Sequence, residues 1–142
     1  MKGWIACAFL VATASLGAQM PPMAKMAITT TEDYSKAMKE VGAQNNALAK
    51  AITSASEADV AASAAKLETT FKDVQAYWEM KKVDDATTAA KNAVAAAQAI
   101  TKATTAHDMA AATAGMTTLR AQCASCHMAH RERLPDGSFQ IK

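Results

Sequence analysis

Apolar side chains recur every three or four positions along four consecutive segments of the chain. The first segment runs from about Glu32 to Ile52, and the second begins after Ser56. A repeat of this length gathers side chains on one face of an α-helix, so we predict an amphipathic helix in each segment. The predicted stripe of the first helix is Tyr34, Met38, Val41, Asn45, Leu48 and Ile52. The predicted stripe of the second is Val60, Ala64, Leu67, Phe71, Val74 and Trp78.

Two more helices are expected in the second half of the chain. The third follows Val83–Asp85, where acidic side chains favour a helix N-terminus, and the fourth begins between Thr105 and Asp108. The third helix carries a small-residue seam of Ala86, Ala90, Ala93, Ala97 and Ile100. The fourth carries Ala112, Met116, Leu119, Cys123, Cys126 and His130. Four such stripes with short links predict an all-α protein, an antiparallel four-helix bundle.

Three local features refine this bundle. Ser56 is a plausible N-cap, because Asp59 stands three residues on, as in a weak capping box. Gly42 lies beside the stripe of the first helix, where we expect it to permit close approach of a neighbour. The small-residue seam of the third helix either admits a closely packed neighbour or leaves room for a large flat cofactor.

The N-terminus has the pattern of a secretory signal. Lys2 precedes the apolar stretch Trp4–Leu16, which is short for a membrane span. The sequence fits cleavage of the signal peptide after either Ala14 or Ala18. We favour Ala18, with an uncleaved membrane anchor as the alternative. The predicted organisation is a signal peptide (1–18), a flexible leader (19–30), a four-helix domain (31–133) and a C-terminal tail (134–142). The tail begins with a turn at Leu134–Gly137 and continues as an extended segment.

The composition restricts the partners. The chain has 142 residues and a formal net charge of +2, which gives no basic footprint for nucleic acid. Cys7 lies in the predicted signal peptide and leaves with it. The mature chain then has two cysteines, Cys123 and Cys126, in a compartment that is oxidising after export. A disulfide between such close neighbours closes almost no loop and stabilises little.

The five residues Cys123-Ala-Ser-Cys126-His127 form the C-x-x-C-H pattern of c-type haem attachment. Positions i, i+3 and i+4 share one face of a helix. Two thiols on that face can bond one porphyrin, and the neutral imidazole of His127 is an ordinary iron ligand. Because both cysteines fall on the stripe of the fourth helix, we expect the haem inside the bundle, near the end of that helix.

Two stretches resemble class II c-type cytochromes, the cytochrome c′ and cytochrome c-556 group. The first continues the haem motif as Cys-x-x-Cys-His-x-x-aromatic-Arg, with His130 at the aromatic position and Arg131 at the last. The second is a first-helix pattern that here has Met38 and Gly42, with Tyr34 in place of arginine. The resemblance covers about residues 30–133. It implies that Met38 faces the distal side of the haem and that Arg131 lies beside His127, or pairs with a haem propionate.

The resemblance implies a periplasmic haem protein that is not an enzyme. The leading hypothesis is a low-spin, cytochrome c-556-like carrier of single electrons with His127 and Met38 as axial ligands, serving periplasmic or membrane-bound redox partners. The alternative is a five-coordinate, cytochrome c′-like protein that binds NO or CO. A thiol-disulfide oxidoreductase is a remote third hypothesis, because no βαβ pattern accompanies the cysteines. A zinc site would crowd its four ligands into one helical turn. The resemblance also allows a homodimer in which two copies of the chain pair through their first two helices.

Overall fold

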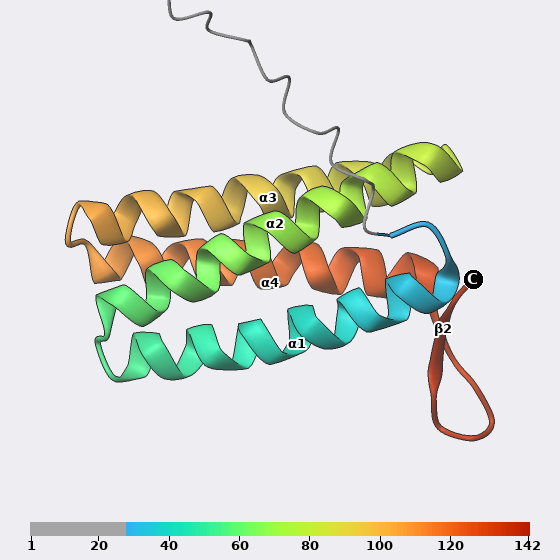
Figure 1. The fold of residues 1–142 in the computed structure, drawn as a ribbon, viewed down its shortest axis with the longest axis horizontal. Coiled ribbons are helices and arrows are strands. Elements are labelled where there is room, and N and C mark those ends of the chain that lie inside the picture. Colours follow the sequence, from blue (N-terminus) through green and yellow to red (C-terminus); the bar gives the residue numbers. More distant parts are fainter. Residues whose placement is uncertain (1–27) are drawn as a thin grey trace, which may run out of the picture.

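Four helices and a short hairpin make up residues 28–142, the part of the chain that the computed structural model describes (Figure 1). The expected signal peptide and residues 19–27 of the expected leader lie outside these described residues. All four predicted helices are confirmed. In chain order the elements are α1 (Thr31–Thr53), α2 (Glu57–Lys81), α3 (Asp84–Thr105), α4 (Met109–His130), β1 (Arg131–Arg133) and β2 (Phe139–Ile141). No helix within residues 28–142 is both long and apolar enough to cross a membrane.

Side-chain caps fix the beginnings of two helices. The Thr30 hydroxyl accepts a hydrogen bond from the Asp33 amide at 3.1 Å, and the Asp108 carboxylate accepts one from the Ala111 amide at 2.8 Å. Ser56 does occupy the N-cap position of α2, but the capping-box prediction is wrong. Its hydroxyl donates to the Asp59 carboxylate at 2.7 Å and accepts no backbone amide of the helix.

The bundle begins earlier than the predicted boundary at residue 31. The side chain of Ile28 is 3% exposed and belongs to the core, and Thr30 caps α1. Residues 28–30 are therefore part of the packed domain rather than of a flexible leader.

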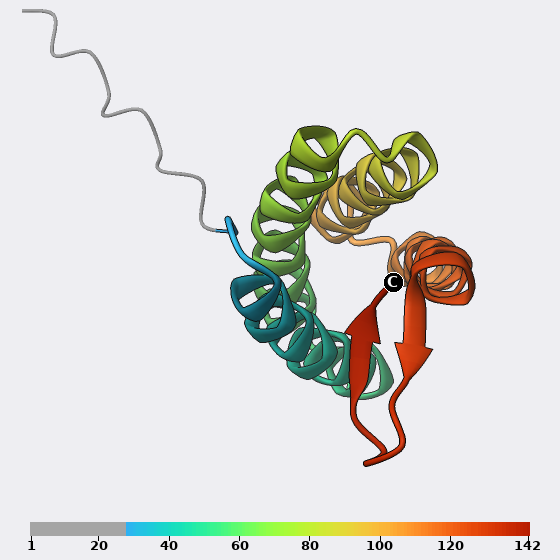
Figure 2. The same cartoon turned by 90° about the vertical axis from the view of Figure 1, so that its right-hand side faces the viewer.

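Each helix packs mainly against its neighbours in the chain. The pairs α1–α2, α2–α3 and α3–α4 are in extensive contact, whereas α1 and α4 touch only sparsely. Seen end-on, the helices form a curved row with α1 and α4 at its two ends (Figure 2). The largest fully buried side chains are Leu48, Val60, Leu67, Tyr77, Ile100 and Leu119. All but Tyr77 belong to the predicted stripes, so the core follows the sequence pattern.

The glycine that permits close helix packing is Gly115, and the prediction for Gly42 is wrong. A Cβ atom added at Gly115 on α4 would lie 2.7 Å from Ile100 Cγ1 on α3. A Cβ atom added at Gly42 would meet nothing within 4 Å. The contact between α3 and α4 therefore depends on a missing side chain, whereas the space beside Gly42 is open.

The chain ends in a β-hairpin that folds back beside α4. Strands β1 and β2 pair antiparallel with Arg131 opposite Ile141. The turn is closed by a hydrogen bond from the Gly137 amide to the Leu134 carbonyl, and Gly137 has a φ of 84°. The predicted turn and extended tail are confirmed. The strand at Arg131–Arg133 differs from the sequence reading, which continued the helical domain to residue 133.

Candidate cofactor site

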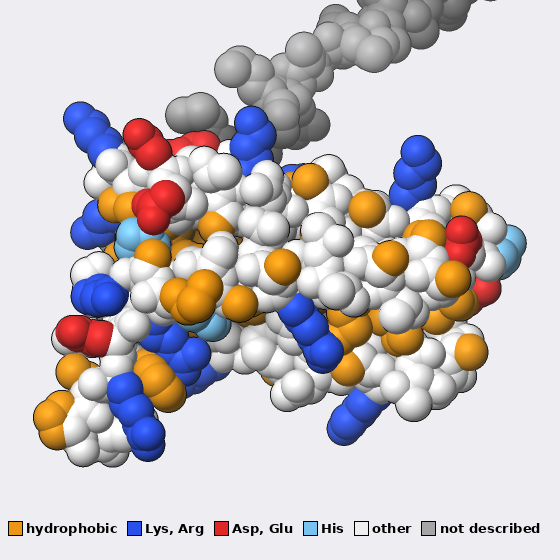
Figure 3. Space-filling view, turned by 180° about the vertical axis from the view of Figure 1, so that it is seen from behind, with side chains coloured by type: hydrophobic (Ala, Val, Ile, Leu, Met, Phe, Trp, Pro, Cys, Tyr) orange, Lys and Arg blue, Asp and Glu red, His pale blue; other side chains and the backbone are white. Residues whose placement is uncertain are grey.

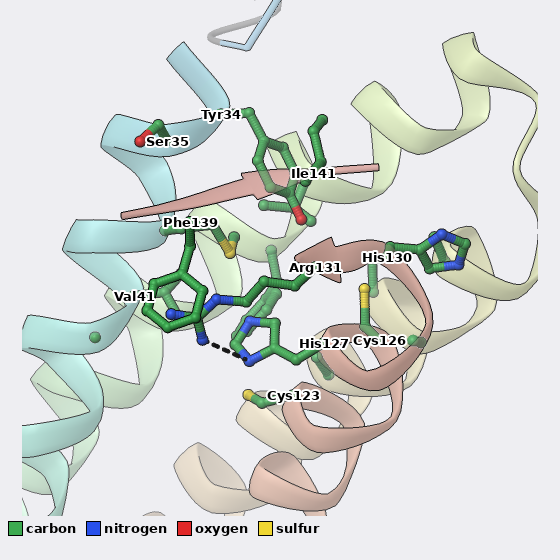
Figure 4. A pocket seen from close by; sticks show the side chains of 18 of the residues that line it. Tyr34, Ser35, Val41, Cys123, Cys126, His127, His130, Arg131, Phe139 and Ile141 are labelled. Carbon is green, nitrogen blue, oxygen red and sulfur yellow. Dashed lines mark hydrogen bonds between the residues drawn. The ribbon is translucent and has the colours of Figure 1, made fainter. Parts of the chain in front are cut away.

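A cavity of about 630 Å³ lies between the four helices and the hairpin. Its size lies within the range of small-molecule and cofactor sites. Cys123, Cys126 and His127 enter it from the last turns of α4 (Figure 4). The helical spacing that suggested a shared face thus brings the two thiols and the imidazole to one cavity.

The other walls are largely apolar. Opposite α4, the α1 wall includes Met38, Val41 and Gly42. The α3 wall consists of four alanines, Ala86, Ala89, Ala90 and Ala93. Ala97 and Ile100, further along the predicted seam, are fully buried in the core instead. The small-residue seam therefore serves both expected purposes, with its first half beside the cavity and its second half in close helix packing.

Both cysteines of the motif are free thiols and half-buried. Burial raises the pKa of the Cys123 thiol. Burial also raises the pKa of Cys126, and the nearby Asp85 carboxylate and Cys123 raise it further. Raised pKa values keep both thiols protonated at neutral pH, which is the opposite of an activated thiolate.

His127 lies at the rim of the cavity beside Arg131. The Arg131 Nη1 atom is 3.5 Å from His127 Nδ1, and the same guanidinium lies 3.5 Å from the centre of the Phe139 ring (Figure 4). Partial burial lowers the pKa of His127, and the Arg131 cation lowers it further. The neutral imidazole, the form that binds a metal, is thereby favoured. The expected position of Arg131 beside His127 is confirmed.

His130 joins an aromatic cluster behind the thiols. Its ring lies 5.3 Å from the Trp78 ring, and its Nε2 atom is 2.8 Å from the Asp85 carboxylate. The Trp78 indole N–H donates to the Tyr34 hydroxyl at 3.1 Å. Sequence reasoning placed Tyr34 and Trp78 on the apolar stripes of the first two helices, and both are buried, with Tyr34 lining the cavity. It missed the partnership with Asp85, which lies 45 residues from His130 in the chain.

A buried polar atom in the cavity wall has no partner. Asn45 Oδ1 accepts no hydrogen bond among the described residues, although buried polar groups are nearly always paired. Asn45 lines the cavity together with Gly42. The unpaired acceptor and the open space beside Gly42 therefore lie in the same wall of the cavity.

The donor set fits c-type haem better than a bare metal ion. No group of three or more His, Cys, Asp or Glu side chains within residues 28–142 is arranged to hold a metal ion. One imidazole and one thioether, from His127 and Met38, are donors that haem iron accepts, since the porphyrin supplies the remaining ligands. The two thiols beside them suit covalent attachment of the porphyrin.

Comparison with known proteins adds no relative to this picture. No protein-family model, curated protein or solved structure matches the chain. The Cys-x-x-Cys-His motif and the cavity are therefore the features of the molecule that bear on its function.

Proposed function

We propose that this protein is an exported electron carrier with one covalently attached haem c. The observation that carries the proposal is the convergence of Cys123, Cys126 and His127 on one cavity whose opposite wall includes Met38. Cys123 and Cys126 would hold the porphyrin by thioether bonds, and His127 would bind the iron. Haem supplies reversible one-electron chemistry at its iron.

Met38 completes the proposed ligand set from α1. Its side chain is half-buried and packs against the core, so it is held rather than free in solvent. Methionine and histidine together raise the reduction potential of a c-type haem, which suits electron transfer. The apolar walls also favour a high reduction potential. A low dielectric disfavours the oxidised haem, which carries more charge than the reduced haem.

The haem would lie in the core of the bundle, near the end of α4, and the links between the helices indicate how that bundle is arranged. Links of two or three residues join successive helices, at 54–56, 82–83 and 106–108. Links this short join neighbouring helices that run in opposite directions, so we infer an antiparallel bundle.

Export through the N-terminal segment to the periplasm belongs to the same proposal, because c-type haem is attached after export.

One observation favours a second candidate function, a five-coordinate protein that binds NO or CO. The space beside Gly42 on the Met38 wall is open, since an added Cβ atom would meet nothing within 4 Å. If Met38 only covers the iron, a small uncharged gas could bind on this side. The thiol-disulfide oxidoreductase hypothesis is disfavoured, because the raised pKa values of both thiols oppose thiolate chemistry.

Optical spectra of the holoprotein test the proposal. The protein is produced with periplasmic haem maturation and measured oxidised, reduced, and reduced under CO. Sharp reduced bands, a weak methionine–iron charge-transfer band and no response to CO are expected. A broad high-spin spectrum that shifts under CO would instead establish the gas-binding function. A protein without haem would contradict both.

A further inference from the structure

The arginines of this chain are confined to its last part. The chain has three, Arg120, Arg131 and Arg133, all near the Cys-x-x-Cys-His motif. Arg120 stands seven residues before His127, and Arg131 stands four residues after it. These spacings place both arginines on the same side of the helix as His127. His127, at the rim of the cavity, therefore has a cation on either side, Arg120 on α4 and Arg131 at the start of β1.

These arginines are not neutralised by carboxylates. None of the ion pairs found within residues 28–142 includes an arginine. The neighbouring carboxylates have other partners within the hairpin. Glu132 accepts a hydrogen bond from Gln140, and Asp136 accepts hydrogen bonds from the amide and hydroxyl of Ser138.

Two exposed apolar side chains accompany the cations. Met128 is 78% exposed and Phe139 is 49% exposed. Figure 3 views the molecule from behind, and hydrophobic and cationic side chains lie together there toward the hairpin. Arginine, methionine and aromatic residues are the types enriched where proteins bind one another. We name this surface the arginine face and define it by Arg120, Met128, Arg131, Arg133 and Phe139.

We propose that the arginine face is the docking surface for an acidic redox protein. The inference rests on the proposed function, because its purpose is to bring the partner to the edge of the haem beside His127. One electron passes between the two redox centres, and no bond is made or broken. Unpaired guanidinium groups recognise carboxylates, and an exposed methionine and phenylalanine suit a protein surface rather than free anions.

The test compares two double variants of the reduced holoprotein that carry the same change in net charge. Arg120→Glu/Arg133→Glu reverses the arginine face without altering Arg131, which contacts His127. Lys66→Glu/Lys102→Glu is the matched control, because both lysines are exposed, stand on α2 and α3, and are not part of the arginine face. Haem content is measured first for each protein, so that loss of the cofactor is separated from loss of docking.

Oxidation by hexacyanoferrate(III), an anion, is followed by stopped flow at low salt. We expect the arginine variant to react about tenfold more slowly than the wild type, and the lysine variant to be much less affected. With tris(phenanthroline)cobalt(III), a cationic oxidant, the arginine variant should instead react faster than the wild type. Poly-L-glutamate, a model acidic surface, should slow the hexacyanoferrate reaction of the wild type and of the lysine control but not of the arginine variant.

Equal rates for the two variants, or no effect of poly-L-glutamate, would overturn the docking proposal while leaving the haem assignment intact. Arginine-dependent binding to phosphatidylglycerol vesicles, without an effect of poly-L-glutamate, would overturn it in favour of a membrane surface. Absence of covalent haem from the wild type would overturn the proposed function and the docking proposal together.

Discussion

Single residues decide which chemistry the cavity supports. The helical spacing of Cys123, Cys126 and His127 was enough to predict that they share a face, and they do enter one cavity. The role of Met38 depends on a second helix, and spacing within one helix cannot place two helices relative to each other. The structure puts Met38 in the opposite wall, so its substitution is informative.

Met38→Ala should open the distal side of the haem. If Met38 binds the iron, its removal converts a low-spin spectrum to a high-spin one and allows CO to bind the reduced protein. Reduced spectra with and without CO measure this change. Met109→Ala is the control, since Met109 is a half-buried methionine that does not line the cavity. An unchanged spectrum in Met38→Ala would exclude the residue as a ligand.

The contact between Asp85 and His130 should make stability depend on pH. The hydrogen bond from His130 lowers the pKa of Asp85 in the folded protein. The unfolded chain then binds a proton more readily, so this contribution is present above the ordinary Asp pKa of about 3.9 and is lost as pH falls through the lowered folded pKa. We expect the difference in unfolding free energy between wild type and Asp85→Asn to shrink as pH falls through that range, as measured by urea denaturation.

The His130→Phe background provides the control for this effect. Phenylalanine keeps an aromatic ring beside Trp78 but offers no hydrogen bond to Asp85. Asp85→Asn should have little further effect there. A pH dependence of the same size in both backgrounds would show that the His130 contact is not its source.

At the level of elements, the helices and the turn at Leu134–Gly137 were predictable, but the strand β1 was not. Repeating apolar positions and local caps are properties of neighbouring residues, so helix positions follow from the sequence. Arg131–Arg133 is a charged run without alternating apolar residues, and it becomes a strand because Phe139–Ile141 pairs with it. Gly42 and Gly115 also show what neighbouring residues do not reveal. Whether a glycine permits close packing depends on which other helix lies against it, and only Gly115 has such a neighbour.

Gly115→Ala and Gly42→Ala should change stability in opposite directions. The Cβ atom at Gly115 would meet the fully buried Ile100, and such overpacking costs about 1–3 kcal/mol, which exceeds the helix gain of roughly 0.5–1 kcal/mol from Gly to Ala. The Cβ atom at Gly42 meets open space, so Gly42→Ala should keep the helix gain. Urea denaturation of protein made without haem measures both. Equal stabilisation by the two substitutions would refute the close α3–α4 contact at Gly115.

For the whole molecule, the sequence predicted four packed helices but not that α1 and α4 touch only sparsely. Sparse contact between α1 and α4 leaves a cavity of about 630 Å³ in a small domain. Filling apolar space stabilises a protein, and a ligand held only by the folded state does so further. We therefore expect the same chain to melt at a higher temperature with haem than without it, as measured by circular dichroism. Equal melting temperatures would indicate that the haem does not occupy the cavity.

The measurement that tests the central claim most directly is the mass of the intact mature protein after acid extraction of non-covalent haem. The wild type, produced with periplasmic haem maturation, should retain the mass of one haem. The Cys123→Ala/Cys126→Ala variant, produced in the same way, should retain none. A wild-type protein whose mass equals that of the polypeptide alone would contradict the account.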